Sequence, residues 1–80
     1  MTQKPLFVRA EWDDEAGVWV ATSDDVPGLA TEADTMEGLI SKLRAMIPEL
    51  LELNQGTDCL PPISFEVLSR RFESLQPAEV

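Results

Sequence analysis

The sequence predicts an α+β fold in which one long helix covers one face of a four-stranded mixed sheet. Two observations predict strands: apolar and polar residues alternate over residues 6–12, and a second alternating segment runs over residues 63–72. A third observation predicts the helix, because apolar residues recur every three or four positions over residues 36–51. We expect residues 1–80 to form a single domain with its core within about residues 6–73.

The first three strands are predicted to form an antiparallel meander. The polar segment 13–17 ends in glycine, which is typical of a hairpin loop between strands at 6–12 and 18–22. Strand 18–22 is apolar on both faces, as expected for a strand in the middle of a sheet. A Pro-Gly pair predicts a type II turn immediately before a short third strand at 29–33.

The start of the helix is marked by residues that commonly cap helices. Asp34 is placed to act as the cap, and Glu37 would then complete a capping box. Thr35 is the alternative cap, one residue later. Gly38 costs roughly 1 kcal/mol relative to alanine inside a helix, so we expect close backbone packing at this position.

Pro48 interrupts the predicted helix. Proline lacks the N–H group that would reach the carbonyl of Arg44, so either the helix kinks or a second short helix begins at Pro48. Because the apolar stripe continues beyond this residue, we favour a kinked helix that ends near residues 54–56.

The order of the elements predicts the topology of the sheet. In a three-stranded meander the first and third strands are parallel, and a right-handed crossover through the helix then places the fourth strand beside the first. The predicted spatial order is therefore 3-2-1-4. A single helix covers one face only, so the other face is left for another contact.

The net charge of −9 is concentrated in one part of the chain. Residues 11–37 contain nine acidic residues and no basic one, whereas the remaining six acidic residues match the six basic residues in number. Such a distribution repels nucleic acid and attracts a basic partner. The alternative is a solvated surface that keeps the protein in solution.

The chain contains no histidine and a single cysteine, Cys59. These absences remove the usual general base, the Ser-His and Cys-His nucleophile pairs, and a structural zinc site. We therefore expect no enzyme activity, no metal and no cofactor. Cys59 has no internal disulfide partner, no apolar run approaches the roughly 18 residues of a membrane span, and the first residues do not resemble a secretory leader, so we expect a cytoplasmic protein.

Several motifs resemble the HicB antitoxin superfamily, in particular its short, stand-alone bacterial members. The similarity covers about residues 6–54 and rests on Asp-Val-Pro-Gly-Leu, Thr-Glu-Ala-Asp-Thr-Met-Glu-Gly-Leu and Pro-Glu-Leu-Leu-Glu-Leu-Asn, preceded by Glu-Trp-Asp-Asp-Glu-Ala-Gly-Val-Trp-Val-Ala. The resemblance implies a truncated ribonuclease H-like fold. It also implies a type II toxin–antitoxin system, in which an acidic antitoxin, commonly oligomeric, neutralises a small basic mRNA-cleaving toxin of the HicA type.

The sequence departs from that superfamily in two respects. Full antitoxins usually add a C-terminal helix-turn-helix or ribbon-helix-helix domain, whereas this chain ends soon after its fourth strand with Arg70 and Arg71 as its basic cluster. We therefore expect no C-terminal DNA-binding domain and no direct nucleic acid binding by the chain alone. Arg9 occupies the middle of the first strand, where working ribonuclease H enzymes place an aspartate.

The candidate partner-binding residues are acidic or aromatic, and each group has a structural alternative. The hairpin acids are also typical of a solvated turn, the two tryptophans can equally pack on each other or on the core, and an aspartate that starts a turn often bonds its own backbone. The candidates are Trp12, Asp13, Asp14, Glu15, Trp19, Asp24, Asp25 and Glu32.

The sequence therefore predicts a non-catalytic acidic module that binds a small basic HicA-type toxin. It is also expected to self-associate, as a dimer or higher homo-oligomer, through its sheet or a helix end. Two alternatives stay open: an orphan homo-oligomeric domain without a toxin partner, and a degenerate nuclease that uses metals held by carboxylates.

Overall fold

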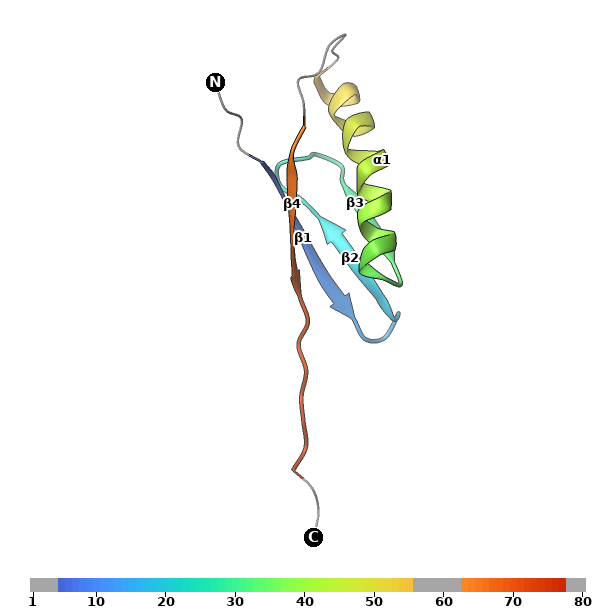
Figure 1. Cartoon of the computed structure of the whole chain (residues 1–80), viewed down its shortest axis with the longest axis vertical. Coiled ribbons are helices and arrows are strands. Elements are labelled where there is room, and N and C mark those ends of the chain that lie inside the picture. Colours follow the sequence, from blue (N-terminus) through green and yellow to red (C-terminus); the bar gives the residue numbers. More distant parts are fainter. Residues whose placement is uncertain (1–4, 56–62, 78–80) are drawn as a thin grey trace.

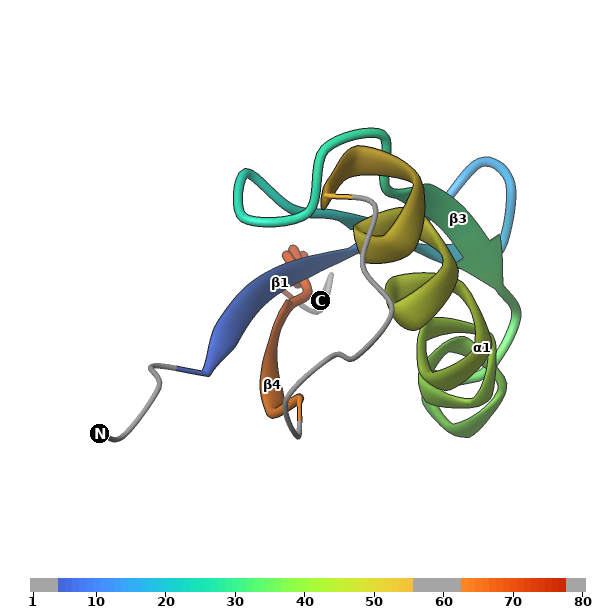
Figure 2. The same cartoon turned by 90° about the horizontal axis from the view of Figure 1, so that it is seen from above.

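A computed structural model describes residues 5–55 and 63–77 of the chain. The sheet has the order β3-β2-β1-β4, in which β4 is parallel to β1 and the other neighbours are antiparallel. The helix lies along one side of this sheet (Figures 1 and 2). The predicted four-stranded mixed sheet with the order 3-2-1-4 is confirmed. The elements are β1 (Leu6–Asp13), β2 (Val18–Thr22), β3 (Ala30–Ala33), α1 (Met36–Gln55) and β4 (Phe65–Arg70).

The hydrophobic core lies between α1 and one face of the sheet. The helix contributes large side chains, whereas the strands beneath it contribute mostly alanine and valine, which lets the helix approach the sheet closely. Each fully buried leucine, isoleucine or valine stabilises the fold by about 1.5–3 kcal/mol before conformational entropy is subtracted. The buried residues are Val8, Ala10, Ala21, Val26, Leu29, Ala33, Leu39, Leu43, Ile47 and Leu51.

Both predicted turns are present. The N–H of Leu29 donates to the carbonyl of Val26 at 3.1 Å, and Gly28 has a φ of 85°, as the third position of a type II turn requires. In the hairpin loop, Gly17 has a φ of 68° and its N–H donates to the carbonyl of Asp13 at 2.8 Å.

The N-terminal cap of α1 is Thr35, the alternative that the sequence left open. Its hydroxyl oxygen accepts a hydrogen bond from the N–H of Gly38 at 3.0 Å, so the predicted capping box of Asp34 and Glu37 is wrong by one residue. The expected close packing at Gly38 is confirmed, because a Cβ atom there would lie 3.0 Å from the Thr35 hydroxyl oxygen and 3.5 Å from the Cβ of Ala33.

The helix is continuous from Met36 to Gln55, so the alternative of a second helix beginning at Pro48 is wrong. Leu51 is buried beyond the proline, which keeps the end of the helix on the core. The side-chain amide of Asn54 donates to the carbonyl of Pro27 at 3.2 Å and thereby ties this end of α1 to the turn before β3.

The remaining differences from the predicted boundaries are small. β3 starts one residue later than expected, and β4 is two residues shorter at each end. Residues 71–77 continue from β4 as an exposed extended segment that leaves the body of the protein (Figure 1).

No helix among the described residues combines the length and the hydropathy needed to cross a membrane. Cys59 lies outside the described residues.

Substitution of the cap should distinguish the two candidate residues. We expect Thr35→Ala to lower the free energy of unfolding by about 1 kcal/mol, because it removes the acceptor for the Gly38 N–H. The matched variant Asp34→Ala should have a smaller effect. Urea unfolding followed by circular dichroism measures both, and a larger loss with Asp34→Ala would show that the cap is misassigned.

Candidate functional site

The candidate partner-binding residues lie at two ends of the sheet. Five of them belong to the hairpin at the end of β1 and the start of β2, whereas Asp25 lies beside Phe7 and Asp24 near Arg9, in the first half of β1. The six-residue step along β1 from Phe7 to Asp13 corresponds to roughly 20 Å. Glu32, on β3, lies in the same cross-strand row as Val20 and Glu11, next to the hairpin end but two strands away from β1. The structure therefore brings together the hairpin residues but not the whole predicted set.

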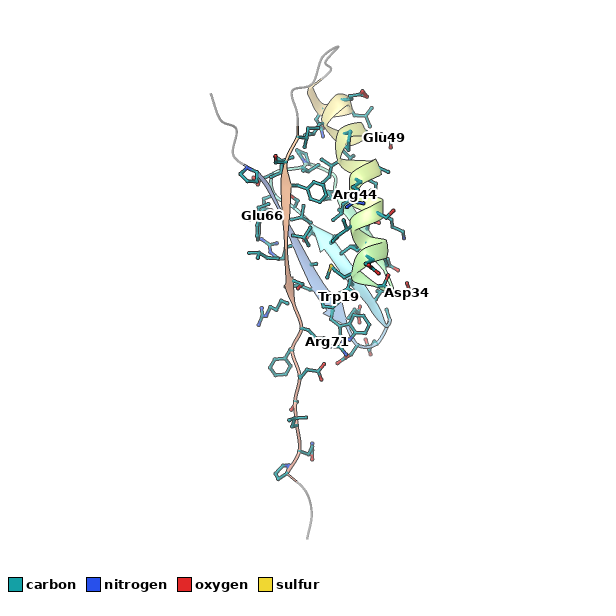
Figure 3. The ribbon with its side chains drawn as sticks, in the orientation of Figure 1. Trp19, Asp34, Arg44, Glu49, Glu66 and Arg71 are labelled. Atoms are coloured by element: carbon teal, nitrogen blue, oxygen red, sulfur yellow. The ribbon has the colours of Figure 1, made fainter. Side chains whose placement is uncertain are left out.

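The two tryptophans pack against each other. Trp12 and Trp19 are opposite residues of β1 and β2, and their ring centroids are 5.3 Å apart with an interplanar angle of 62°. The guanidinium of Arg71 lies 4.5 Å from the centroid of the Trp12 ring, a cation–π contact that the sequence did not suggest. Figure 3 shows Trp19 and Arg71 near the hairpin end of the sheet. Both tryptophans are half-buried, so part of each ring faces solvent.

The carboxylates of the hairpin loop have local partners. Asp13 accepts hydrogen bonds from the N–H groups of Glu15 and Ala16 at 3.0 and 3.2 Å, as an aspartate that starts a turn commonly does. Asp14 accepts a hydrogen bond from the indole nitrogen of Trp12 at 2.6 Å. These contacts fix the shape of the loop, and they leave all three acidic side chains exposed.

An open hollow of about 490 Å³ lies at this end of the sheet. Glu11 belongs to it but was not among the predicted residues. The alternation of β1 could have identified it, because Glu11 lies two residues before Asp13 and therefore on the same face. Four carboxylates thus line a hollow beside one aromatic ring. The lining residues are Glu11, Trp12, Asp13, Asp14, Glu15 and Val20.

At the opposite end of the sheet, side chains form hydrogen bonds with the part of β1 that does not pair with β2. The ladder between β1 and β2 ends at Arg9 and Thr22, so the backbone of Phe7 needs other partners. The Asp25 carboxylate accepts a hydrogen bond from the Phe7 N–H at 2.8 Å, and the Ser23 hydroxyl donates to the Phe7 carbonyl at 2.5 Å.

The alternative function of Asp24 and Asp25 was to bond the backbone of their own turn, and for Asp25 this is corrected, because its carboxylate bonds the N–H of Phe7. Ser23 has that role, because its hydroxyl oxygen accepts from the N–H groups of Asp25 and Val26 at 3.0 and 3.3 Å. Asp24 is 92% exposed and lies 3.7 Å from the guanidinium of Arg9. Such a surface ion pair contributes at most about 1 kcal/mol.

The face of the sheet opposite α1 mixes charged and apolar residues. In one cross-strand row, Glu11, Val20 and Glu32 are neighbours on β1, β2 and β3. Arg70 of β4 lies on the other side of Glu11. Val20 is half-buried, which fits the prediction that β2 carries a second apolar set on the face that α1 leaves uncovered.

The carboxylates of the sheet are not arranged as a metal site. Within residues 5–55 and 63–77, no three side chains of histidine, cysteine, aspartate or glutamate are grouped so that they could hold a metal ion.

Comparison with known proteins places this arrangement in a family. The family model described as "Domain of unknown function (DUF1902)" matches residues 5–76. The chain belongs to this family. It is also similar to a crystal structure of the hypothetical protein TTHA1013 from the extremely thermophilic bacterium Thermus thermophilus, with 53% sequence identity. The alignment covers 91% of this chain and 99% of that one, with a TM-score of 0.69. No curated protein matches the chain.

The two acidic residues next to β1 should differ in their effect on stability. We expect Asp25→Ala to lower the free energy of unfolding by about 1–2 kcal/mol, because the Phe7 N–H loses a charged acceptor. Asp24→Ala should change it by less than about 0.5 kcal/mol, as is usual for an exposed side chain. Chemical denaturation of both variants checks this, and equal losses would contradict the assigned contacts.

Proposed function

We propose that this DUF1902 chain is a non-catalytic, HicB-like antitoxin that binds and neutralises a small basic mRNA-cleaving toxin of the HicA type. The proposal rests on the HicB-like motifs in residues 6–54 and on one structural observation. At the hairpin end, the acidic residues Glu11, Asp13, Asp14 and Glu15 line an open hollow together with Trp12 and Val20. This arrangement is suited to a partner that presents lysine or arginine side chains.

In the proposed mechanism, charge and contact act at different distances. The acidic residues of the hairpin and of β3 attract a basic partner over a distance of about one Debye length. This attraction raises the rate at which the two proteins meet. Trp12 is held between Trp19 and Arg71, so it is a rigid aromatic side chain of the kind that contributes most to binding energy at interfaces. The carboxylate of Asp25 is occupied by the backbone of Phe7, which leaves Asp24 as the more available charge at the other end.

The most direct test is co-expression with the product of the adjacent reading frame. The proposal predicts that this neighbour inhibits growth when expressed alone, that the DUF1902 chain restores growth, and that the two proteins co-purify. A harmless neighbour that does not bind would contradict the antitoxin function and would favour an orphan homo-oligomer. Cleavage of RNA by the purified chain in the presence of magnesium or manganese would instead support the degenerate nuclease.

The location of the binding surface can be tested with two charge-matched variants. We expect Glu11→Lys combined with Glu15→Lys to weaken binding of the basic partner at least tenfold at low salt, because both side chains line the hairpin hollow. The loss should shrink at high salt, where surface charges are screened.

The control changes the net charge by the same amount elsewhere. Glu49→Lys combined with Glu52→Lys alters two exposed positions in the C-terminal half of α1, away from the hairpin (Figure 3). Titration calorimetry of both variants at two salt concentrations separates the cases. Equal losses would mean that only net charge matters and that the hairpin is not the binding surface.

A further inference from the structure

One edge of the strand β4 is unpaired within the part of the chain that the structure describes. This strand is the last in the order β3-β2-β1-β4, and among the described residues it pairs only with β1. The backbone of α1 lies nearest β3 and β2, on the far side of the sheet, so the helix does not lie over this edge (Figure 2). Exposed strand edges carry unpaired N–H and C=O groups that readily pair with another strand. Proteins usually protect such edges, and β4 contains no proline and is covered by no helix of the described residues.

Large apolar side chains are exposed along the same segment. Leu68 of β4 is 59% exposed, and Phe72 and Leu75 in the extension that follows are 75% and 93% exposed. On the helix side, β4 also borders an open hollow of about 520 Å³. Exposed apolar side chains that follow one another along an unpaired strand edge favour a contact with another chain. The hollow is lined by Ile40, Arg44, Ile63, Ser64, Phe65 and Val67.

The charges of β4 are self-complementary. Glu66 and Arg70 lie on the same face of the strand, two residues before and two residues after Leu68. If two copies of β4 pair antiparallel with Leu68 opposite Leu68, then Glu66 of each copy lies opposite Arg70 of the other. Opposite charges in directly facing positions stabilise an antiparallel pair, whereas like charges destabilise it.

Other symmetric registers lack this complementarity. In a symmetric antiparallel pair, a two-fold axis runs perpendicular to the sheet and leaves each side chain on its own face of the sheet. The axis must therefore lie between a residue of one copy and the same residue of the other copy. An axis at Val67 places Glu66 opposite Leu68, and one at Ser69 places Arg70 opposite Leu68. An axis at Glu66 or at Arg70 places like charges opposite each other.

We propose that two copies of this chain associate through the free edges of β4, antiparallel, with Leu68 on the two-fold axis. The result is a continuous eight-stranded sheet with both helices on one face. In this register Phe72 of each copy lies opposite Ser64 of the other, so the exposed extension adds to the pairing. The pairing involves this chain alone and does not depend on the proposed toxin.

Charge exchange at the axis tests the register. Sedimentation velocity should show a dimer for the wild type, and Glu66→Arg should raise the dissociation constant at least tenfold because it replaces two attractive pairs by two repulsive ones. Arg70→Glu should do the same, and the double variant E66R/R70E should restore the dimer. Arg70 also neighbours Glu11 within its own chain, whereas Glu66 neighbours Phe7, so Glu66→Arg gives the cleaner measurement.

The control for this experiment is the opposite edge of the sheet. Glu32→Arg reverses an exposed charge on β3, the other edge strand, and should leave the dimer intact. Thermal unfolding followed by circular dichroism establishes that each variant is folded. A monomeric wild type, a double variant that stays monomeric, or dissociation by Glu32→Arg would each overturn the proposal.

A disulfide crosslink provides a test that does not depend on charge. In a Cys59→Ser background, Leu68→Cys should give a crosslinked dimer on mild oxidation, because facing residues of an antiparallel pair are about 4.5–5.5 Å apart at Cα and a disulfide spans about 4.4–6.8 Å. Glu66→Cys should not crosslink, since the two copies of position 66 are roughly 13 Å apart along the strands. Crosslinking at 66 in place of 68, or at neither position, would overturn the register.

Discussion

The structure depends on the packing of a single 20-residue helix against one face of the sheet. Ala10 and Ala21 are opposite residues on β1 and β2, and both are completely buried beneath the helix. Their small side chains leave room for Leu43 and Ile47, so the core fills by combining large helical with small strand residues. Enlarging either alanine would force the helix away from the sheet and expose the apolar stripe that holds the domain together.

This packing explains which surfaces stay available. The helix lies on one face of the sheet with its backbone nearest β3 and β2, so the opposite face and the edge of β4 have no cover from within the described part of the chain. The small domain therefore keeps Val20 half-buried on the uncovered face and Leu68 exposed at the edge. A larger protein would cover both with further elements, whereas a domain of this size gains additional burial most readily from a second chain.

The sequence predicted the elements and the order of the strands but missed the side-chain contacts that join distant residues. Alternation, helical spacing, an apolar run and turn residues located the five elements, because each of these signals is contained within a single segment. The cap was placed one residue early, since Asp34 and Thr35 are both good caps and only the backbone decides between them. The hydrogen bonds between Phe7 and the side chains of Ser23 and Asp25 arise because the pairing of β1 with β2 ends at Arg9 and Thr22. The sequence alone does not show where that pairing ends. The contact of Arg71 with Trp12 depends on the register of β4 against β1, which the predicted strand order does not specify.

The two proposed surfaces are compatible because of the direction of the strands. In an antiparallel pairing through β4, the hairpin ends of the two copies point in opposite directions along the strand axis, so each keeps its own acidic hollow. Trp12 and Arg70 line a further hollow beside the hairpin, which shows that the end of β4 nevertheless reaches this site. Dimer formation would therefore fix the position of β4, and with it the position of Arg71 over Trp12, without occupying the hairpin acids. A dimer that binds one basic partner at each end would form a complex with two copies of each protein, in which the acidic surfaces act independently.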